Sequence, residues 1–76
     1  MEISKFISNF AAQFDETDIE SFTAETQFRE IDEWSSLLAL SVMAMLDEEY
    51  DVMIKGDEMR NSKTIQDLYD IVNSKL

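Results

Sequence analysis

Apolar residues recur at helical spacing over much of this chain, and almost nothing in the sequence interrupts a helix. The 76 residues contain no proline and a single glycine, Gly56, a composition that favours long helices and few tight turns. Residues 2–14 carry apolar side chains three and one residues apart, at Ile3, Phe6, Ile7, Phe10, Ala11 and Phe14. This spacing predicts a helix with one apolar face.

Two further segments have the same periodicity. Residues 36–51 predict a second long helix with two offset apolar stripes. The first stripe is Ala39, Val42, Met43, Leu46 and Tyr50, and the second is Leu37, Leu40 and Ala44. The last helix is expected from Thr64 onwards, because Thr64 and Asp67 have the spacing of a capping box.

The other segments connect these helices. Residues 15–34 have no regular period, which predicts a long first loop with one short helical turn near residues 17–22. Gly56 interrupts the chain after the second long helix, and a short helix is expected at residues 57–60. We therefore predict one domain over residues 1–76, an all-α four-helix bundle with three longer helices and one short helix.

The apolar stripes also predict the core. Its expected members are Phe6, Phe10, Val42, Met43, Leu46, Ile54, Leu68, Tyr69 and Val72. Among the other methionines, Met53 is assigned to the core. Met45 and Met59 are assigned to the surface.

Three apolar residues of the first loop are also expected to contact the core or a partner. Phe28 and Ile31 are expected to attach the loop to the core. Trp34 either anchors the loop on the helices, which we favour, or shapes a surface for a partner.

The charge balance limits the possible partners. Lys and Arg number 6 against 17 Asp and Glu, a net charge of −11. Nucleic acids and anionic membrane surfaces repel such a chain, whereas basic patches on proteins attract it. No apolar run exceeds five residues, and the N-terminus lacks the layout of a secretory signal. We therefore expect a cytoplasmic protein that does not bind nucleic acid and does not insert into a membrane. We also expect a monomer.

The residue types argue against an enzyme and against a metal site. The chain contains no histidine and no cysteine, so the commonest general base and the usual nitrogen and thiolate metal ligands are missing. A hydrolase with two carboxylates needs a concave substrate site, and we interpret the acidic residues instead as a solvated surface. No window fits the spacing of an EF-hand calcium loop. We expect no catalytic residue and no metal ligand.

Ser36 is the strongest candidate for a functional residue. Ser35 and Ser36 stand at the expected start of the second long helix, directly after Trp34. A serine at a helix start faces solvent, where another enzyme can reach it. The alternative is that Ser35 or Ser36 only caps the helix, a common role of serine that contributes about 1 kcal/mol.

The segment from Ser35 onwards resembles the acyl carrier protein family. In that family a modified serine, typically within Asp-Ser-Leu, begins the second helix, and an acidic stretch ends it. Here Ser35-Ser36-Leu37 corresponds to the tripeptide, and Leu46-Asp47-Glu48-Glu49-Tyr50-Asp51 resembles the acidic stretch. The last helix, over residues 64–72, is also similar, so the resemblance covers nearly the whole chain.

The resemblance implies a carrier protein without catalytic activity of its own. Ser36 would carry 4′-phosphopantetheine, which a separate phosphopantetheinyl transferase transfers from coenzyme A with Mg²⁺. The thiol of this arm would hold an acyl group as a thioester, so the sulfur would arrive with the cofactor. Ser35 is the second candidate for the attachment, and the Leu37 that follows Ser36 favours Ser36.

The resemblance also implies a surface for partner enzymes. The stripe of Leu37, Leu40 and Ala44 would face the transferase and the acyl-loading and acyl-transfer enzymes. Basic patches on these enzymes would meet four acids, which are Asp47, Glu48, Asp57 and Glu58. Such contacts mainly accelerate encounter and weaken with salt.

Three positions differ from the usual family pattern. Ser35 stands in place of an Asp that assists the transferase, Glu33-Trp34 stands where a Gly is usual, and Lys55-Gly56 replaces a Pro. The Trp resembles specialised carriers more than the fatty-acid type. Fatty acid, polyketide, amino acid and lipid-modification cargoes all remain open. The alternatives are an acidic interaction domain of the same fold that is never modified, and a DNA-mimicking inhibitor.

Overall fold

Four α-helices and two short 3₁₀ helices make up the computed structural model, which describes residues 2–76. In chain order they are α1 (Ile3–Ala11), η1 (Ile19–Ser21), η2 (Phe28–Glu30), α2 (Ser36–Tyr50), α3 (Gly56–Asn61) and α4 (Ile65–Lys75). No strand occurs between residues 2 and 76, and the predicted all-α four-helix bundle is confirmed. Within the same residues, no helix is long and apolar enough to cross a membrane.

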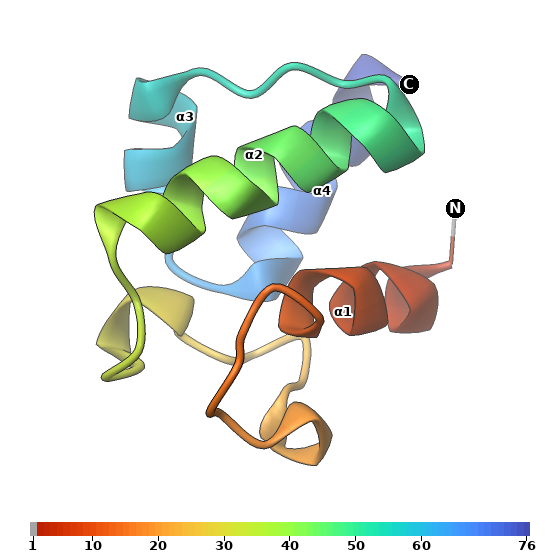
Figure 1. The fold of residues 1–76 in the computed structure, drawn as a ribbon. Coiled ribbons are helices and arrows are strands. Elements are labelled where there is room, and N and C mark those ends of the chain that lie inside the picture. Colours follow the sequence, from red (N-terminus) through yellow and green to blue (C-terminus); the bar gives the residue numbers. More distant parts are fainter. Residues whose placement is uncertain (1) are drawn as a thin grey trace.

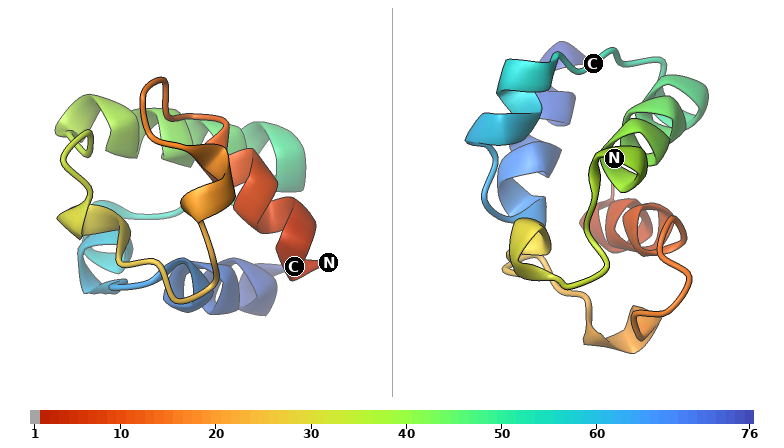
Figure 2. Two further views of the ribbon diagram at one scale, coloured as in Figure 1. Left: turned by 90° about the horizontal axis from the view of Figure 1, so that it is seen from below. Right: turned by 60° about the vertical axis from the view of Figure 1, so that its left-hand side comes forward.

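The chain reverses after α2, and this reversal positions α3. α2 is the longest helix, and α1 packs against both α2 and α4 (Figure 1). Asp51 ends α2 with left-handed backbone angles, φ 55° and ψ 41°, which Asp tolerates better than most residues. The following segment returns along α2, so that α3 lies beside the N-terminal half of α2 (Figures 1 and 2).

Most helix boundaries agree with the sequence pattern, and the first helix is the main exception. The helix predicted over residues 2–14 ends at Ala11, and the chain continues as turns in which the amide of Phe14 donates to the carbonyl of Ala11 at 3.0 Å. The side chain of Phe14 stays buried, so the apolar spacing extends beyond the helix itself. The expected turn near residues 17–22 is η1, whereas η2 lies where no helix is predicted.

The predicted capping box of the last helix is present. The hydroxyl of Thr64 accepts from the amide of Asp67 at 3.1 Å. The carboxylate of Asp67 in return accepts from the amides of Thr64 at 3.2 Å and Lys63 at 3.0 Å. These bonds satisfy amides that α4 itself leaves without partners.

The core contains most of the side chains that the sequence predicts. Phe6, Phe10, Val42, Leu46, Ile54, Leu68 and Val72 are buried. Met43 and Tyr69 are half-buried and pack against this core from its edge. Eight further apolar side chains complete it, which are Ala11, Phe14, Phe22, Phe28, Met45, Val52, Met59 and Ile65.

Three methionine assignments are wrong, for identifiable reasons. Met53 is 76% exposed, because it lies in an extended segment where alternate side chains point to opposite sides and its neighbours Val52 and Ile54 point inward. Met45 is buried, because the inner face of α2 runs through Val42, Met45 and Leu46 rather than through Met43. Met59 is also buried and is the inward-facing apolar side chain of α3.

Aromatic rings attach the long first loop to the helices. Phe28 is fully buried, and Ile31 is half-buried against the core, as predicted. The rings of Phe28 and Trp34 lie 4.9 Å apart, and the ring of Phe28 lies 5.2 Å from that of Phe10 in α1. Trp34 also stacks on Phe10 at 6.3 Å, with only 8° between the planes. The anchoring role that we favour for Trp34 is therefore confirmed.

Candidate functional site

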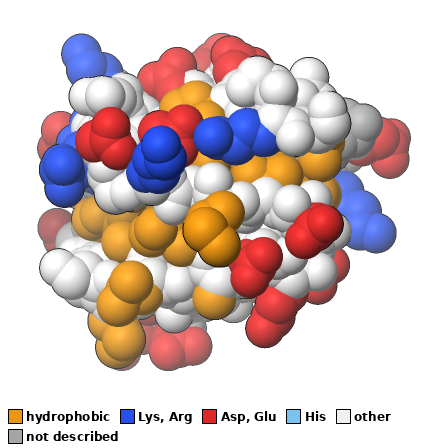
Figure 3. All heavy atoms as spheres, turned by 90° about the horizontal axis from the view of Figure 1, so that it is seen from above, with side chains coloured by type: hydrophobic (Ala, Val, Ile, Leu, Met, Phe, Trp, Pro, Cys, Tyr) orange, Lys and Arg blue, Asp and Glu red, His pale blue; other side chains and the backbone are white. Residues whose placement is uncertain are grey.

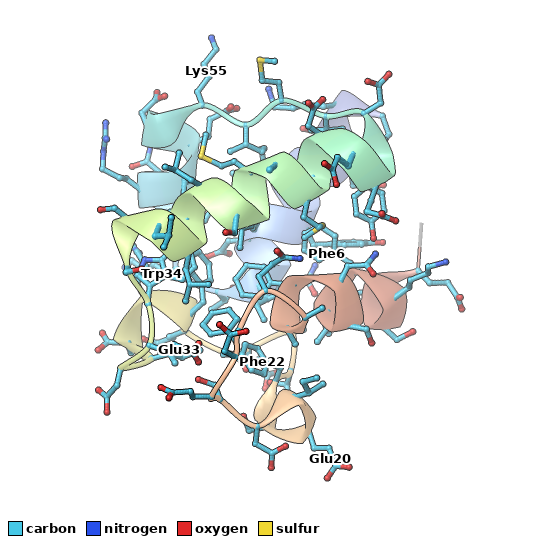
Figure 4. The ribbon with its side chains drawn as sticks, in the orientation of Figure 1. Phe6, Glu20, Phe22, Glu33, Trp34 and Lys55 are labelled. Carbon is cyan, nitrogen blue, oxygen red and sulfur yellow. The ribbon has the colours of Figure 1, made fainter. Side chains whose placement is uncertain are left out.

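The loop before α2 is held by one carboxylate. The Glu33 side chain accepts from the amides of Asp15 at 2.7 Å, Glu16 at 3.1 Å and Thr17 at 2.9 Å, and from the Thr17 hydroxyl at 2.8 Å. The bond from the Asp15 amide is the main reason why the pKa of Glu33 lies below its usual 4.5. Trp34 lies just below the N-terminal end of α2, and Glu33 lies further below it (Figure 4). Both therefore position the residues that follow.

The N-cap of α2 is Ser35. Its backbone is extended, and its hydroxyl accepts from the amide of Leu38 at 3.2 Å. Its carbonyl also accepts from the amide of Ala39 at 3.0 Å. Ser35 thus has the local task that a serine at a helix start commonly has.

Ser36 is the first residue of the helix and is exposed. Its hydroxyl makes no hydrogen bond within residues 2–76. The interpretation of Ser36 as a helix cap is therefore wrong, because Ser35 already occupies that position. Ser36 presents a free hydroxyl to solvent at the start of α2.

A groove of about 500 Å³ lies beside Ser36, between the N-terminal half of α2, η2 and α3. Its lining is mostly apolar and comprises Trp34, Ala39, Leu40, Met43 and Met59, together with Ser35, Ser36 and Gly56. The space-filling view from above shows a band of hydrophobic side chains crossing the molecule, with Lys and Arg side chains next to it (Figure 3). A groove of this size is typical of small-molecule sites.

Arg29 and Arg60 also line this groove, and sequence reasoning does not predict their role. They are the only two arginines of the chain, and they come from η2 and α3 respectively. Neither guanidinium makes an ion pair or a hydrogen bond within the described residues, although acids outnumber bases almost three to one. The sequence does contain a signal, because both arginines of this acidic chain flank the segment that contains Ser36. Their separation along the chain does not predict that they meet, and only the fold brings them to one groove.

The predicted partner stripe lies on the outer side of α2. Leu37 is 74% exposed, Leu40 is 62% exposed, and Ala44 is also exposed. Leu40 belongs to both this stripe and the groove. Isolated exposed leucines are ordinary, but here two of them stand on the same helix as the exposed Ser36.

The four predicted acids do not lie together. Asp47 and Glu48 are exposed in the last turn of α2, whereas Asp57 is exposed in the first turn of α3, beside the other end of α2. Glu58 is engaged within the fold, because its carboxylate accepts from the amide of Lys55 at 2.9 Å and pairs with Lys75 at 3.2 Å. The bond from the Lys55 amide, followed by Lys75, lowers the pKa of Glu58.

Among residues 2–76 no group of three or more acids is arranged to hold a metal ion. The spread of the acids along α2 and α3 instead leaves them as separate charged surfaces.

Comparison with protein families identifies the chain. The family described as "Phosphopantetheine attachment site" matches residues 5–72. Searches of curated proteins and of solved structures gave no match. This family is defined by covalently attached 4′-phosphopantetheine, and its domains are in general carriers rather than catalysts. The match covers α2 and α3 in full and leaves out only the first residues of α1 and the last residues of α4, and the chain therefore belongs to the phosphopantetheine-attachment family of the acyl carrier proteins.

Proposed function

We propose that this protein carries acyl or related intermediates as thioesters on a 4′-phosphopantetheine arm attached to Ser36. The observation that carries this assignment is the contrast between the two serines. Ser35 is engaged as the helix cap through Leu38, whereas Ser36 has an exposed hydroxyl with no partner within the described chain. Ser36 can therefore react without disturbing the bond between the Ser35 hydroxyl and the Leu38 amide.

The surroundings of Ser36 fit the group. During attachment the Ser36 oxygen forms a new phosphate ester, the phosphoanhydride bond of coenzyme A breaks, the nucleotide part leaves, and the hydroxyl proton passes to a base of the transferase. The resulting phosphodiester carries one negative charge. α2 has no acid in its first turn, and the free amides and dipole at a helix start favour an anion. When bound, the arm supplies the thiol that this chain lacks.

The partner surface belongs to the same proposal. We infer that Leu37, Leu40 and Ala44 contact the transferase and the acyl-handling enzymes, and that Asp47 and Glu48 attract their basic patches. Asp57 would act at the other end of the surface. Glu58 would contribute less than the other acids, because its carboxylate already accepts from the Lys55 amide and pairs with the Lys75 ammonium. The contribution of exposed charges lies mainly in the rate of encounter.

The test is the intact mass of the protein after incubation with coenzyme A, Mg²⁺ and a phosphopantetheinyl transferase of broad specificity. The unmodified protein and the variants Ser35→Ala and Ser36→Ala are treated in parallel. We expect one phosphopantetheinyl group to be added to the unmodified chain and to Ser35→Ala, and none to Ser36→Ala. Loss only in Ser35→Ala would move the attachment to Ser35. No addition to any folded form, with several transferases, would favour the unmodified interaction domain.

A further inference from the structure

We propose that Arg29 and Arg60 hold the phosphate of the arm at the mouth of the groove beside Ser36, so that the adjacent part of the arm rests in the groove. This inference depends on the proposed attachment to Ser36. It assigns a role to two residues that neither the helix packing nor the partner surface requires, because both arginines are exposed and neither has a partner within the described residues.

The charge distribution is the first argument. Only 6 of the 76 residues are basic, yet the two that carry a guanidinium lie on the same groove from different elements of the fold. Although the chain has 17 acids, neither guanidinium is paired with one of them among residues 2–76. A phosphodiester on Ser36 would bring the missing anion to this groove.

The chemistry of arginine is the second argument. A guanidinium presents a planar fork of donors that matches two oxygens of a phosphate, and such charge-assisted bonds are stronger than bonds between neutral groups. The side chain of Arg60 folds back towards the start of α3, where its Nη1 lies 3.7 Å from the position that a Cβ on Gly56 would take. Gly56 itself lines the groove, so this guanidinium stays at the groove wall.

The groove itself is the third argument. Its wall of Trp34, Ala39, Met43 and Met59 is apolar, which suits the dimethyl-substituted carbon chain next to the phosphate. The arm would therefore meet cations where it is charged and apolar side chains where it is not.

The alternative role for the arginines is docking of an acidic surface of a partner enzyme, and this role does not require the arm.

Nuclear magnetic resonance of the isolated protein separates these possibilities. Transferase-loaded and unloaded ¹⁵N-labelled protein are compared through the Nε–H signals of Arg29 and Arg60 and the indole N–H signal of Trp34. The methyl signals of the arm are compared with those of the loaded protein unfolded in urea. We expect all three N–H signals to move on loading, and the methyl signals to differ from those of the unfolded form.

Three variants give the test its controls. The double variant Arg29→Gln/Arg60→Gln should return the Trp34 indole and the arm methyls to their undocked positions. Lys63→Gln removes one positive charge close to Arg29, in a separate hollow, and should leave docking intact. Arg60→Lys keeps the charge, loses the fork, and should give an intermediate shift. Full loading of each variant is verified by intact mass. Because both arginines are exposed, their replacement should leave the fold unchanged.

The outcomes are distinct. A protein that never gains the mass of the arm contradicts the proposed function and this inference together. A loaded protein whose arginine signals do not move, and whose methyl signals match the unfolded form, contradicts this inference alone and favours partner docking. An equal loss of docking in Lys63→Gln would also overturn it, because a general positive field would then explain the effect.

Discussion

The two adjacent serines should respond in opposite ways to the same substitution. Ser35→Ala removes the hydroxyl that accepts from the Leu38 amide at 3.2 Å. Loss of an N-cap costs about 1 kcal/mol, with a range of about 0.5–2 kcal/mol. For a domain of this size, about 1 kcal/mol lowers the melting temperature by about 4–8 °C. Ser36→Ala removes a hydroxyl without a partner in the described chain, and Ala favours the helix, so its free energy of unfolding should change by less than about 0.5 kcal/mol.

Urea unfolding followed by circular dichroism measures both variants, and intact mass after transferase treatment measures their loading. We expect Ser35→Ala to be less stable but loaded, and Ser36→Ala to be as stable as the parent but not loaded. Ser35→Asp is the matched control, because Asp also caps helices and its charge suits a helix start. Equal destabilisation by Ser35→Ala and Ser36→Ala, or no loss in either, would refute the division of roles between the two hydroxyls.

Three further predictions concern the loop and the acids. Phe28→Ala removes a fully buried ring that contacts Trp34 and should lower the free energy of unfolding by about 3–5 kcal/mol; a loss below about 1 kcal/mol in urea unfolding would show that the loop is not anchored there. The lowered pKa of Glu33 means that its contribution is complete above pH 4.5 and is lost as the pH falls through its folded value. Thermal unfolding from pH 7 to 3 should therefore show a smaller acid-induced loss in Glu33→Gln than in the parent, and identical slopes would contradict this. Asp47→Lys and Glu48→Lys should each slow loading by the transferase at low salt and approach the parent rate at high salt; an unchanged rate at low salt would argue against steering by these acids.

Short sequence patterns predict the helices well where residues close together in the chain determine the structure. The Thr64–Asp67 spacing predicts a capping box that the structure contains, and the apolar spacing of α1 predicts its buried face. The same spacing continues to Phe14 after the helix has ended, because Phe14 packs on Phe22 at 5.0 Å in the loop cluster. Apolar residues at helical spacing thus predict which side chains are buried, but they do not show that the backbone around each one is helical.

Local signals predict less where an extended or very short segment contacts a distant element. Met53 and Met59 are assigned to the wrong environments because the direction of each depends on how the segment after α2 returns along the helix. The helix cap is a related case, since either serine has the right chemistry and only the backbone angles of Ser35 decide between them.

The sequence by itself determines an acidic, all-helical chain without histidine or cysteine, and it predicts that the modified residue is one of a serine pair at the start of the second helix. These features follow from residue types and short spacings. Tertiary structure alone decides that the Ser35 hydroxyl is bonded to the Leu38 amide, whereas the Ser36 hydroxyl has no partner among residues 2–76. It alone also brings Arg29, Arg60 and Met59 to one groove beside Ser36. The physical reason is that the reversal at Asp51 and the aromatic anchoring of the first loop join segments that are far apart in the chain.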